Sequence, residues 1–286
     1  MDAESCGKTF PNTVREGSLR PVSFIVLGHQ RTGSTLVASK LNSHPRICCY
    51  EEVFLPWVDT GPSLREWLQV RNLPQCLRVV PGVRTSFLNW LFDCSNMPSD
   101  IGAIGFKLMY NQFSLWPKFS YLMPMAGQVL KDPALQSWLR STKVLVIHTL
   151  RRNRLKTLVS HELAAQSGRF HSRDPHGGDT PVRDRKVFIP LRGLKARLHR
   201  IGAAERAARN SIVGLPSIEI WYESYVSASG AQDDARLCAA LGQYIPAGGL
   251  TSPLRKVASD NLHDSIANYE QVAAHLSGTR FECFLE

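Results

Sequence analysis

The stretch Phe24-Ile-Val-Leu-Gly-His-Gln-Arg-Thr-Gly-Ser-Thr-Leu36 decides the fold. The apolar run from Val22 to Leu27 starts two residues before this stretch, contains several β-branched residues and predicts a buried parallel strand. A polar turn with Gly28 and Gly33 follows, and a helical pattern then runs from Ser34 to about Asn42. In such a unit, backbone N–H groups converge on the turn and the helix dipole adds positive potential. The stretch therefore predicts an anion-binding site at the carboxyl end of a strand.

The spacing of the two glycines is that of a phosphate-binding loop, but the residue after the second glycine differs. Gly28-x-x-x-x-Gly33 fits the loop of ATP-binding proteins, in which a lysine follows and reaches the β- and γ-phosphates. Ser34 stands in that place here, and the nearby cation is Arg31, two residues before Gly33. The loop is therefore predicted to hold a phosphate without being built for a triphosphate.

Length and charge limit the classes of protein to consider. The 286 residues, 43% of them hydrophobic, are enough for a sizeable core, and we expect a single domain over residues 1–286. A net charge of +10 and a pI of about 9.5 favour an acidic partner: nucleic acid, a membrane surface or an anionic small molecule. The basic residues are spread along the chain without interleaved aromatic residues, so nucleic acid is not the expected partner.

Cysteine usage and the lack of long apolar runs indicate the compartment. The seven cysteines form no C-x-x-C pair and no metal-ligand spacing, which predicts a reducing compartment and no required metal. Residues 1–20 read as a polar tail without the features of a signal peptide, and no apolar run is long enough to span a bilayer. The expected location is the cytoplasm, with peripheral association at a membrane as an alternative.

Strands and helices alternate along the chain, which predicts an α/β fold with a central, mainly parallel sheet. Residues 56–100 contain helical pieces divided by prolines and are interpreted as a helical insertion over one face of the sheet. Residues 166–190 are polar and lack periodicity, as expected for a mobile loop. A last helix is predicted to begin at an Asp260 cap and to end at Gly278. The remaining predicted strands are residues 47–50, 103–108, 143–150 and 217–222, and the remaining predicted helices are residues 126–140, 154–165, 195–209 and 233–241.

A second basic motif follows one of the predicted strands. Arg151-Arg152-Asn153 comes directly after residues 143–150, and Ser160 lies eight residues beyond Arg152, two turns into the next helix. The arginine side chains and the Ser160 side chain can reach the edge of the sheet beside the glycine loop. An arginine fork and a serine hydroxyl suit a phosphate there. Alone, such an arginine pair is more often a solvated helix start. The pair indicates an anion site only because it occurs together with the glycine loop.

Both motifs resemble those of the sulfotransferases that use 3′-phosphoadenosine 5′-phosphosulfate (PAPS). Arg31-Thr-Gly-Ser-Thr35 is similar to their loop for the 5′-phosphosulfate. His148-Thr-Leu-Arg-Arg-Asn-Arg154 with Ser160 is similar to their segment for the 3′-phosphate. The resemblance implies a fold of the P-loop nucleotide-hydrolase type, a three-layer sandwich, with PAPS as co-substrate and no metal.

Three further segments are similar to the bacterial carbohydrate branch of that family. They are Leu41-Asn-Ser-His-Pro45, Tyr50-Glu-Glu-Val-Phe54 and Gly105-Phe-Lys-Leu108. The branch includes enzymes that act on trehalose, on nodulation factors and on lipopolysaccharide sugars. The resemblance touches most of the chain and is weakest at residues 56–100 and 166–210.

The resemblance also implies which residues bind PAPS. Arg31 occupies the family's cationic position, where it would neutralise charge on the bridging oxygen as the S–O bond breaks. Arg152 and Ser160 would hold the 3′-phosphate, and Arg255 with Lys256 would add charge there. The other loop residues that would bind the 5′-phosphate, through backbone and hydroxyl donors, are Thr32, Gly33, Ser34 and Thr35.

The general base is less clearly marked. Many eukaryotic members use the histidine of a Lys-Thr-His segment, but Lys107 is followed here by Leu108 and Met109. Lys107, at the end of a predicted strand, is either a surface lysine or a ligand-binding residue that joins Arg31 in catalysis. The resemblance to the bacterial branch implies instead that a glutamate after the second strand is the general base. The distance to Phe54 favours Glu52, with Glu51 second. At Glu51 this chain departs from the family pattern, which usually has glycine there.

The sequence therefore predicts a sulfotransferase that transfers a sulfuryl group from PAPS to a hydroxyl by in-line displacement, with a glutamate as general base. The expected acceptor is a carbohydrate or glycolipid, bound by residues 56–100 and the loop at 166–190. The alternatives are a P-loop kinase of a small molecule, a basic nucleic-acid-binding protein without activity, and an inactive relative that retains nucleotide. The acceptor's identity and the oligomeric state, a homodimer included, stay open.

Overall fold

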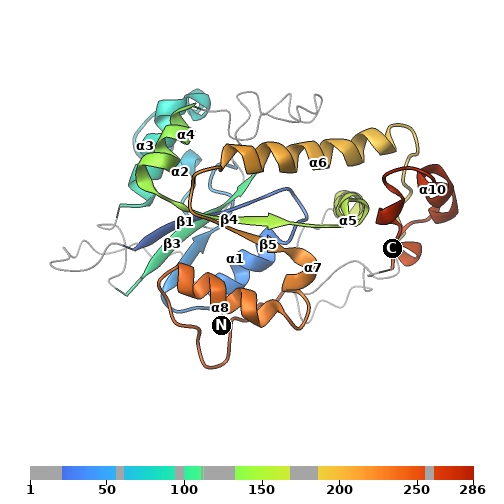
Figure 1. Cartoon of the computed structure of the whole chain (residues 1–286). Coiled ribbons are helices and arrows are strands. Elements are labelled where there is room, and N and C mark those ends of the chain that lie inside the picture. Colours follow the sequence, from blue (N-terminus) through green and yellow to red (C-terminus); the bar gives the residue numbers. More distant parts are fainter. Residues whose placement is uncertain are drawn as a thin grey trace.

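The computed structural model describes residues 21–55, 61–93, 100–110, 112, 133–167, 186–254 and 261–286. At its centre lies a sheet of five strands in the order β2-β3-β1-β4-β5, with every pair of neighbours parallel (Figure 1). The strands are β1 (Val22–Gly28), β2 (Ile47–Tyr50), β3 (Ala103–Met109), β4 (Leu145–Leu150) and β5 (Ser217–Trp221). The predicted α/β class with a parallel sheet is confirmed, and the quoted stretch supplies the central strand.

Helices connect the strands and cover both faces of the sheet (Figure 1). Within the described residues, none of them is both long and apolar enough to cross a membrane. The helices are α1 (Ser34–Asn42), α2 (Leu64–Val70), η2 (Gln75–Val79), α3 (Pro81–Leu91), α4 (Pro133–Thr142), α5 (Arg154–Ser167), α6 (Leu194–Ser211), α7 (Tyr222–Tyr225), α8 (Gly230–Ala240), α9 (Leu262–Ser265), α10 (Tyr269–Leu276) and η5 (Glu282–Phe284).

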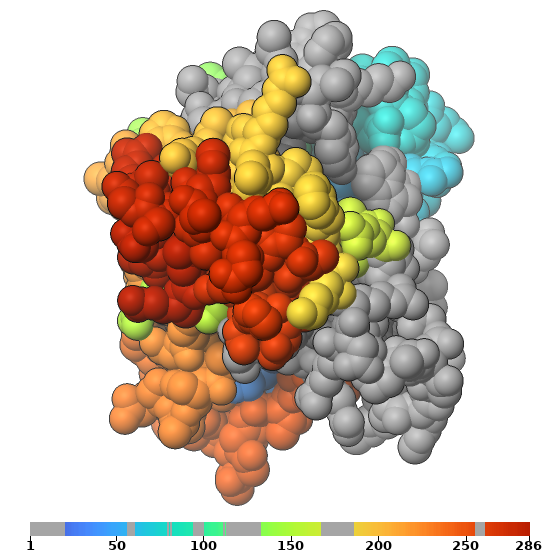
Figure 2. Space-filling model, turned by 90° about the vertical axis from the view of Figure 1, so that its right-hand side faces the viewer, coloured from blue at the N-terminus to red at the C-terminus, as the bar shows by residue number. Residues whose placement is uncertain are grey.

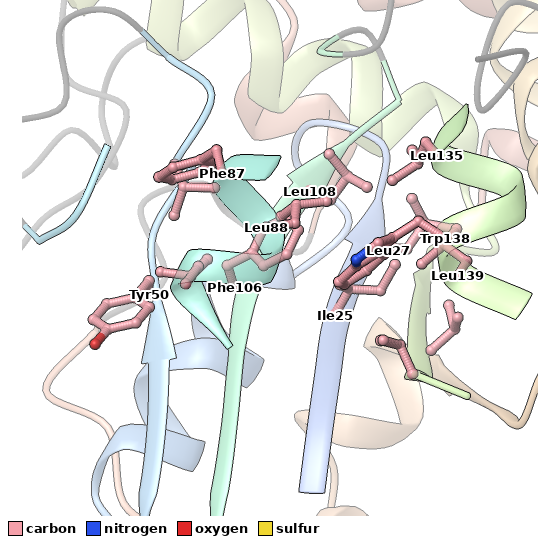
Figure 3. Close-up of a cluster of buried hydrophobic side chains, with 14 of the residues drawn as sticks. Ile25, Leu27, Tyr50, Phe87, Leu88, Phe106, Leu108, Leu135, Trp138 and Leu139 are labelled. Carbon is pink, nitrogen blue, oxygen red and sulfur yellow. The ribbon is translucent and has the colours of Figure 1, made fainter. Parts of the chain in front are cut away.

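Alternate residues of β1 supply the cores of the two faces, because successive side chains of a strand point in opposite directions. Ile25 and Leu27 belong to the core under α2, α3, α4 and the end of α6, and Figure 3 shows them beside Phe106 and the α3 and α4 side chains. Phe24 and Val26 belong to the opposite core, under α1 and α8. The pattern explains why every residue from Phe24 to Leu27 is fully buried, and it makes the molecule a three-layer sandwich.

A third apolar cluster lies outside the sheet and positions residues 261–286, the C-terminal segment. It joins α5, the beginning of α6 and α10, which Figure 1 shows beyond the end of β4. Leu155, Leu198 and Leu276 are fully buried members of this cluster. The C-terminal segment therefore packs close to the edge of the sheet at which the strands end.

The prediction of one continuous last helix was wrong. Two short helices, α9 and α10, occupy the segment, and the side chain of Asn261 caps the first of them, whereas Asp260 lies outside the described residues. Between the helices, Ile266 forms a parallel bridge with Val187, and the Ala267 N–H donates to the Val187 carbonyl at 2.9 Å. These long-range bonds use backbone groups that a continuous helix would have paired internally.

The bounds predicted for the mobile loop were wrong at both ends. Residues 166–167 belong to α5, and Val187 and Ile189 are fully buried in the third cluster. Residues 168–185 lie outside the described residues, as does the predicted tail at 1–20. Within residues 56–100, the described part contains α2, η2 and α3.

Candidate functional site

The glycine loop turns sharply between β1 and α1 because two of its residues have left-handed backbone conformations. Gly33 has a φ of 90° and Arg31 a φ of 67°, which is uncommon for a residue with a side chain. A Cβ atom at Gly33 would lie 2.7 Å from Cδ2 of Tyr222, so this ring packs directly on the loop. No side chain caps α1 at Gly33, and its first turn contains no acidic residue. The positive end of α1 is therefore available to an anion.

Two loop hydroxyls that were predicted to bind phosphate are engaged within the protein. Thr32 Oγ1 donates to the His29 carbonyl at 2.7 Å and lies 3.1 Å from Thr149 Oγ1. Ser34 Oγ donates to Met109 Sδ at 3.8 Å. Thr32 and Ser34 are both buried. Their hydroxyls hold the loop in shape, and the Ser34 backbone N–H belongs to the uncapped first turn of α1.

Arg31 contacts Ser160 and so joins the two anion sites that the sequence predicts. Arg31 Nε donates to Ser160 Oγ at 2.9 Å. Arg151, buried at the end of β4, donates from Nη1 to the Arg31 carbonyl at 3.3 Å, and its guanidinium lies 4.7 Å from the centroid of the Tyr222 ring. Burial lowers the pKa of both guanidinium groups, and the nearby Arg151 charge lowers the pKa of Arg31 further. Two neighbouring cations favour an anion with more than one charge.

Arg152, the arginine expected from the sequence, is exposed and lies with its guanidinium 5.6 Å from the centroid of the Trp221 ring. The Glu223 carboxylate accepts hydrogen bonds from the backbone N–H groups of Arg152, at 3.1 Å, and Asn153, at 3.3 Å. Asn153 in turn caps α5 by accepting from the Lys156 N–H at 2.9 Å. Because a carboxylate already occupies the start of α5, a bound anion would contact the side chain of Arg152 rather than these amides.

Lys107 is buried at the end of β3 and holds two carboxylates beside the glycine loop. Its Nζ lies 2.6 Å from Glu51 Oε2 and 3.2 Å from Glu52 Oε1. The same ammonium donates to Thr35 Oγ1 at 2.9 Å. The lysine side chain is 2% exposed, against 24% for Glu51 and 17% for Glu52. Lys107 is therefore not a surface lysine, and both carboxylates remain within reach of a ligand.

Gln112 adds a second donor to one of these carboxylates. Its Nε2 donates to Glu52 Oε2, and its Oε1 accepts from the Met109 N–H at 3.1 Å, which fixes the amide. Glu51 lies closer to the lysine, whereas Glu52 is held by two donors. Both are placed to take a proton from a hydroxyl at this edge, so the geometry keeps both as candidate bases.

A buried tyrosine–histidine pair joins the residue that follows β3 to a residue within β4. The Tyr110 hydroxyl is hydrogen-bonded to Nε2 of His148, whose Nδ1 lies 3.8 Å from Glu219 Oε1. Burial lowers the pKa of His148 to about 4 and raises the pKa of Tyr110 well above its usual range. Both groups are therefore neutral at pH 7 and add no charge to the site.

Arg255 and Lys256, which were predicted to bind the 3′-phosphate, lie outside the described residues. Among the residues that are described, no group of three or more His, Cys, Asp or Glu side chains is placed to hold a metal ion. The sequence reasoning missed three residues of the site: Arg151, Tyr222 and Gln112. Of these, only Arg151 had a signal in the sequence, because it belongs to the Arg151-Arg152-Asn153 motif that follows a predicted strand.

Comparison with known proteins gives a family match over most of the chain. The family model described as Stf0 sulphotransferase matches residues 23–271. No curated protein sequence matches the chain. Among solved structures, the chain is similar to a sulfotransferase from Alicyclobacillus acidocaldarius, with 14% identity over 93% of this chain and 96% of the other, and a TM-score of 0.41.

Proposed function

The chain belongs to the Stf0 sulphotransferase family, and on this premise we propose that it transfers a sulfuryl group from PAPS to a hydroxyl of a saccharide or glycolipid. One observation carries the proposal: the glycine loop contacts an anion-binding group at one end and a proton acceptor at the other. Arg31 bonds to Ser160 at 2.9 Å, and Thr35 bonds at 2.9 Å to Lys107, which holds Glu51 and Glu52. A donor bound along the loop would then lie beside a base.

The groups around the loop suit the two anionic parts of PAPS. The uncapped start of α1 and Arg31 would bind the 5′-phosphosulfate. Ser160, Arg152 and, as a further proposal, Arg255 with Lys256 would bind the 3′-phosphate. An ATP-type loop lysine is absent from the motif, and Ser34 occupies its place. This set of donors fits a nucleotide with two separate anionic groups better than a triphosphate.

In the proposed reaction the acceptor oxygen forms a bond to sulfur while the bond from sulfur to the 5′-phosphate oxygen breaks, and 3′,5′-ADP leaves. The hydroxyl proton passes to Glu52, with Glu51 as the second candidate. Arg31 offsets the charge that develops on the leaving phosphate. Lys107 positions the two carboxylates and ties them to Thr35. Catalysis then comes from positioning and charge, as in phosphoryl transfer.

Transfer of label from [35S]PAPS to saccharide and lipid extracts tests the activity and identifies the acceptor class. Arg31→Ala and Arg152→Ala should each abolish transfer while the protein stays folded, because each removes a charge from the donor site. Rates like those of the wild type in both variants would show that the donor site is wrongly assigned. Calorimetry adds a direct comparison, since a sulfotransferase binds 3′,5′-ADP and a kinase binds ATP with Mg²⁺.

A pair of isosteric variants distinguishes the two candidate bases. Glu52→Gln should leave 3′,5′-ADP affinity intact and lower turnover about a hundredfold or more, the usual contribution of a general base. Glu51→Gln is the matched control, because it removes the same charge from the same lysine. If Glu51→Gln shows the large loss instead, Glu51 is the base.

A further inference from the structure

Beyond the donor site, basic side chains surround a hollow between α5, α6 and the C-terminal segment. We call it the basic hollow. Figure 2 shows the C-terminal segment, in red, against the yellow residues of α6 on this face of the molecule. The lining residues are Arg154 of α5, His199 and Arg206 of α6, and Arg280, Phe281 and Phe284 near the C-terminus.

Arg154 is held in the basic hollow by three elements of the structure. Gly202 of α6 makes room for it, since a Cβ atom there would lie 2.5 Å from the Arg154 Cζ. The buried carboxylate of Glu205 accepts two hydrogen bonds from the guanidinium, at 3.0 and 2.9 Å. The Phe284 ring lies on another side, with its centroid 5.7 Å from Cζ. The guanidinium is therefore oriented before any ligand arrives, which lowers the entropic cost of binding.

The other two arginines of the basic hollow lack such a partner. In the part of the chain that the structure describes, no carboxylate forms an ion pair with Arg206 or Arg280. Arg280 lies 4.8 Å from the centroid of the Phe281 ring, which leaves its guanidinium edge free to donate. Against the single carboxylate of Glu205, the three guanidinium groups leave two positive charges. A group with two negative charges would balance them.

The basic hollow is separate from the donor site. Arg154 and Ser160 are six residues apart on α5, which turns their side chains by about 240° relative to each other around the helix axis. Ser160 faces Arg31, whereas Arg154 faces Glu205 on α6. An anion in the basic hollow would therefore not contact the Arg31–Ser160 pair.

We propose that the basic hollow is a second anion-binding site, which takes a phosphate monoester. Guanidinium groups donate in the fork geometry that such oxyanions accept. The Phe281 and Phe284 rings provide an apolar surface for the carbon body that carries the ester. The same chemistry occurs in a soluble phosphorylated compound and in the headgroup of an anionic lipid, and the experiment distinguishes these sources. The site does not depend on the proposed transferase activity.

Calorimetry with inorganic pyrophosphate tests the site, with 3′,5′-ADP present in excess to fill the donor site. The titration is repeated with Arg31→Ala, so that the result stands even if the nucleotide does not bind. The double variant Arg206→Ala/Arg280→Ala should weaken pyrophosphate binding at least about tenfold, because it removes two charged donors. The control, Arg192→Ala/Arg200→Ala, removes the same charge near the start of α6 without touching the lining, and should leave the affinity unchanged.

Cosedimentation with phosphatidylcholine vesicles, with and without phosphatidic acid, identifies the source of the ligand. If Arg206→Ala/Arg280→Ala loses binding to the phosphatidic acid vesicles and Arg192→Ala/Arg200→Ala does not, the ligand is assigned as a lipid headgroup. If Arg206→Ala/Arg280→Ala loses pyrophosphate binding and the wild type does not bind the phosphatidic acid vesicles, the ligand is assigned as a soluble ester. An equal loss in both double variants would reduce the basic hollow to general surface charge and overturn the proposal, as would a wild-type protein that binds neither probe. Melting temperatures equal to that of the wild type verify that the variants are folded.

Discussion

Replacing Lys107 by methionine removes a buried cation while keeping a side chain of similar length. The ammonium that is lost lies 2.6 Å from Glu51, 3.2 Å from Glu52 and 2.9 Å from the Thr35 hydroxyl. Two adjacent carboxylates then face each other without a countercharge. We expect this change to destabilise the fold rather than only to affect activity.

The size of the effect follows from the burial of the three groups. Removal of one partner from a buried ion pair costs about 3–5 kcal/mol, because the remaining charge is left uncompensated. Water reaches the carboxylates in part, since their side chains are 24% and 17% exposed. The expected loss for Lys107→Met is therefore at the lower end, about 3 kcal/mol. For a urea dependence of about 3 kcal/mol per molar, the midpoint of unfolding falls by about 1 M.

Urea unfolding followed by circular dichroism measures this shift, and a second variant identifies its cause. Lys107→Met/Glu51→Gln/Glu52→Gln makes the whole cluster neutral and should recover most of the lost stability, because uncharged groups need no partner ion. A loss below about 1 kcal/mol in Lys107→Met would refute the reasoning. So would a triple variant as unstable as the single one, since the loss would then come from packing and not from charge.

Three more predictions address the loop and the buried histidine. Gly33→Ala should be more destabilising than Gly193→Ala in urea unfolding and should weaken 3′,5′-ADP binding. Both glycines have positive φ, but of the two only Gly33 has a ring, Tyr222, in the space of the new Cβ. Equal losses of unfolding free energy in the two variants would contradict the packing of Tyr222 on the loop. Ser160→Ala should weaken 3′,5′-ADP binding about fivefold by calorimetry, through the loss of a hydrogen bond worth about 1 kcal/mol, and unchanged affinity would place the 3′-phosphate elsewhere. His148 should make the unfolding free energy of the wild type fall from pH 6.5 toward pH 4, because the unfolded chain takes up a proton near pH 6.5 and the folded one only near the pKa of about 4. The loss approaches about 3 kcal/mol. Urea unfolding of His148→Gln across the same pH range should lack this dependence of stability on pH.

The sequence was most informative where chemistry and backbone geometry depend on the same residues. The glycine loop was predictable because Gly28, Gly33 and the apolar run before them each have a local structural reason. The parallel sheet was predictable from the alternation of strands and helices. The family resemblance rested on these same segments, and the family match over residues 23–271 agrees with it.

The prediction was least successful where contacts come from distant parts of the chain. The break between α9 and α10 results from a bridge to Val187, about 80 residues away, and helical periodicity contains no trace of it. The contact of Tyr222 with the loop depends on the neighbouring positions of β4 and β5 and has no motif. Arg151 is different, because it shares a strand face with Thr149, whereas Arg152 was assigned by its resemblance to the family's 3′-phosphate segment.

The contacts at the two ends of the glycine loop have a consequence for how the two substrates bind. Arg31 is bonded to α5 and Thr35 to the lysine of β3, and only a few residues separate them. A ligand that draws Arg31 away from Ser160 changes the segment that also orients Lys107 and its carboxylates. Thermodynamic linkage is reciprocal: the free energy by which a bound donor changes acceptor affinity equals that by which a bound acceptor changes donor affinity. In the proposed reaction, the loop would thus couple the occupancy of the donor site to that of the acceptor site.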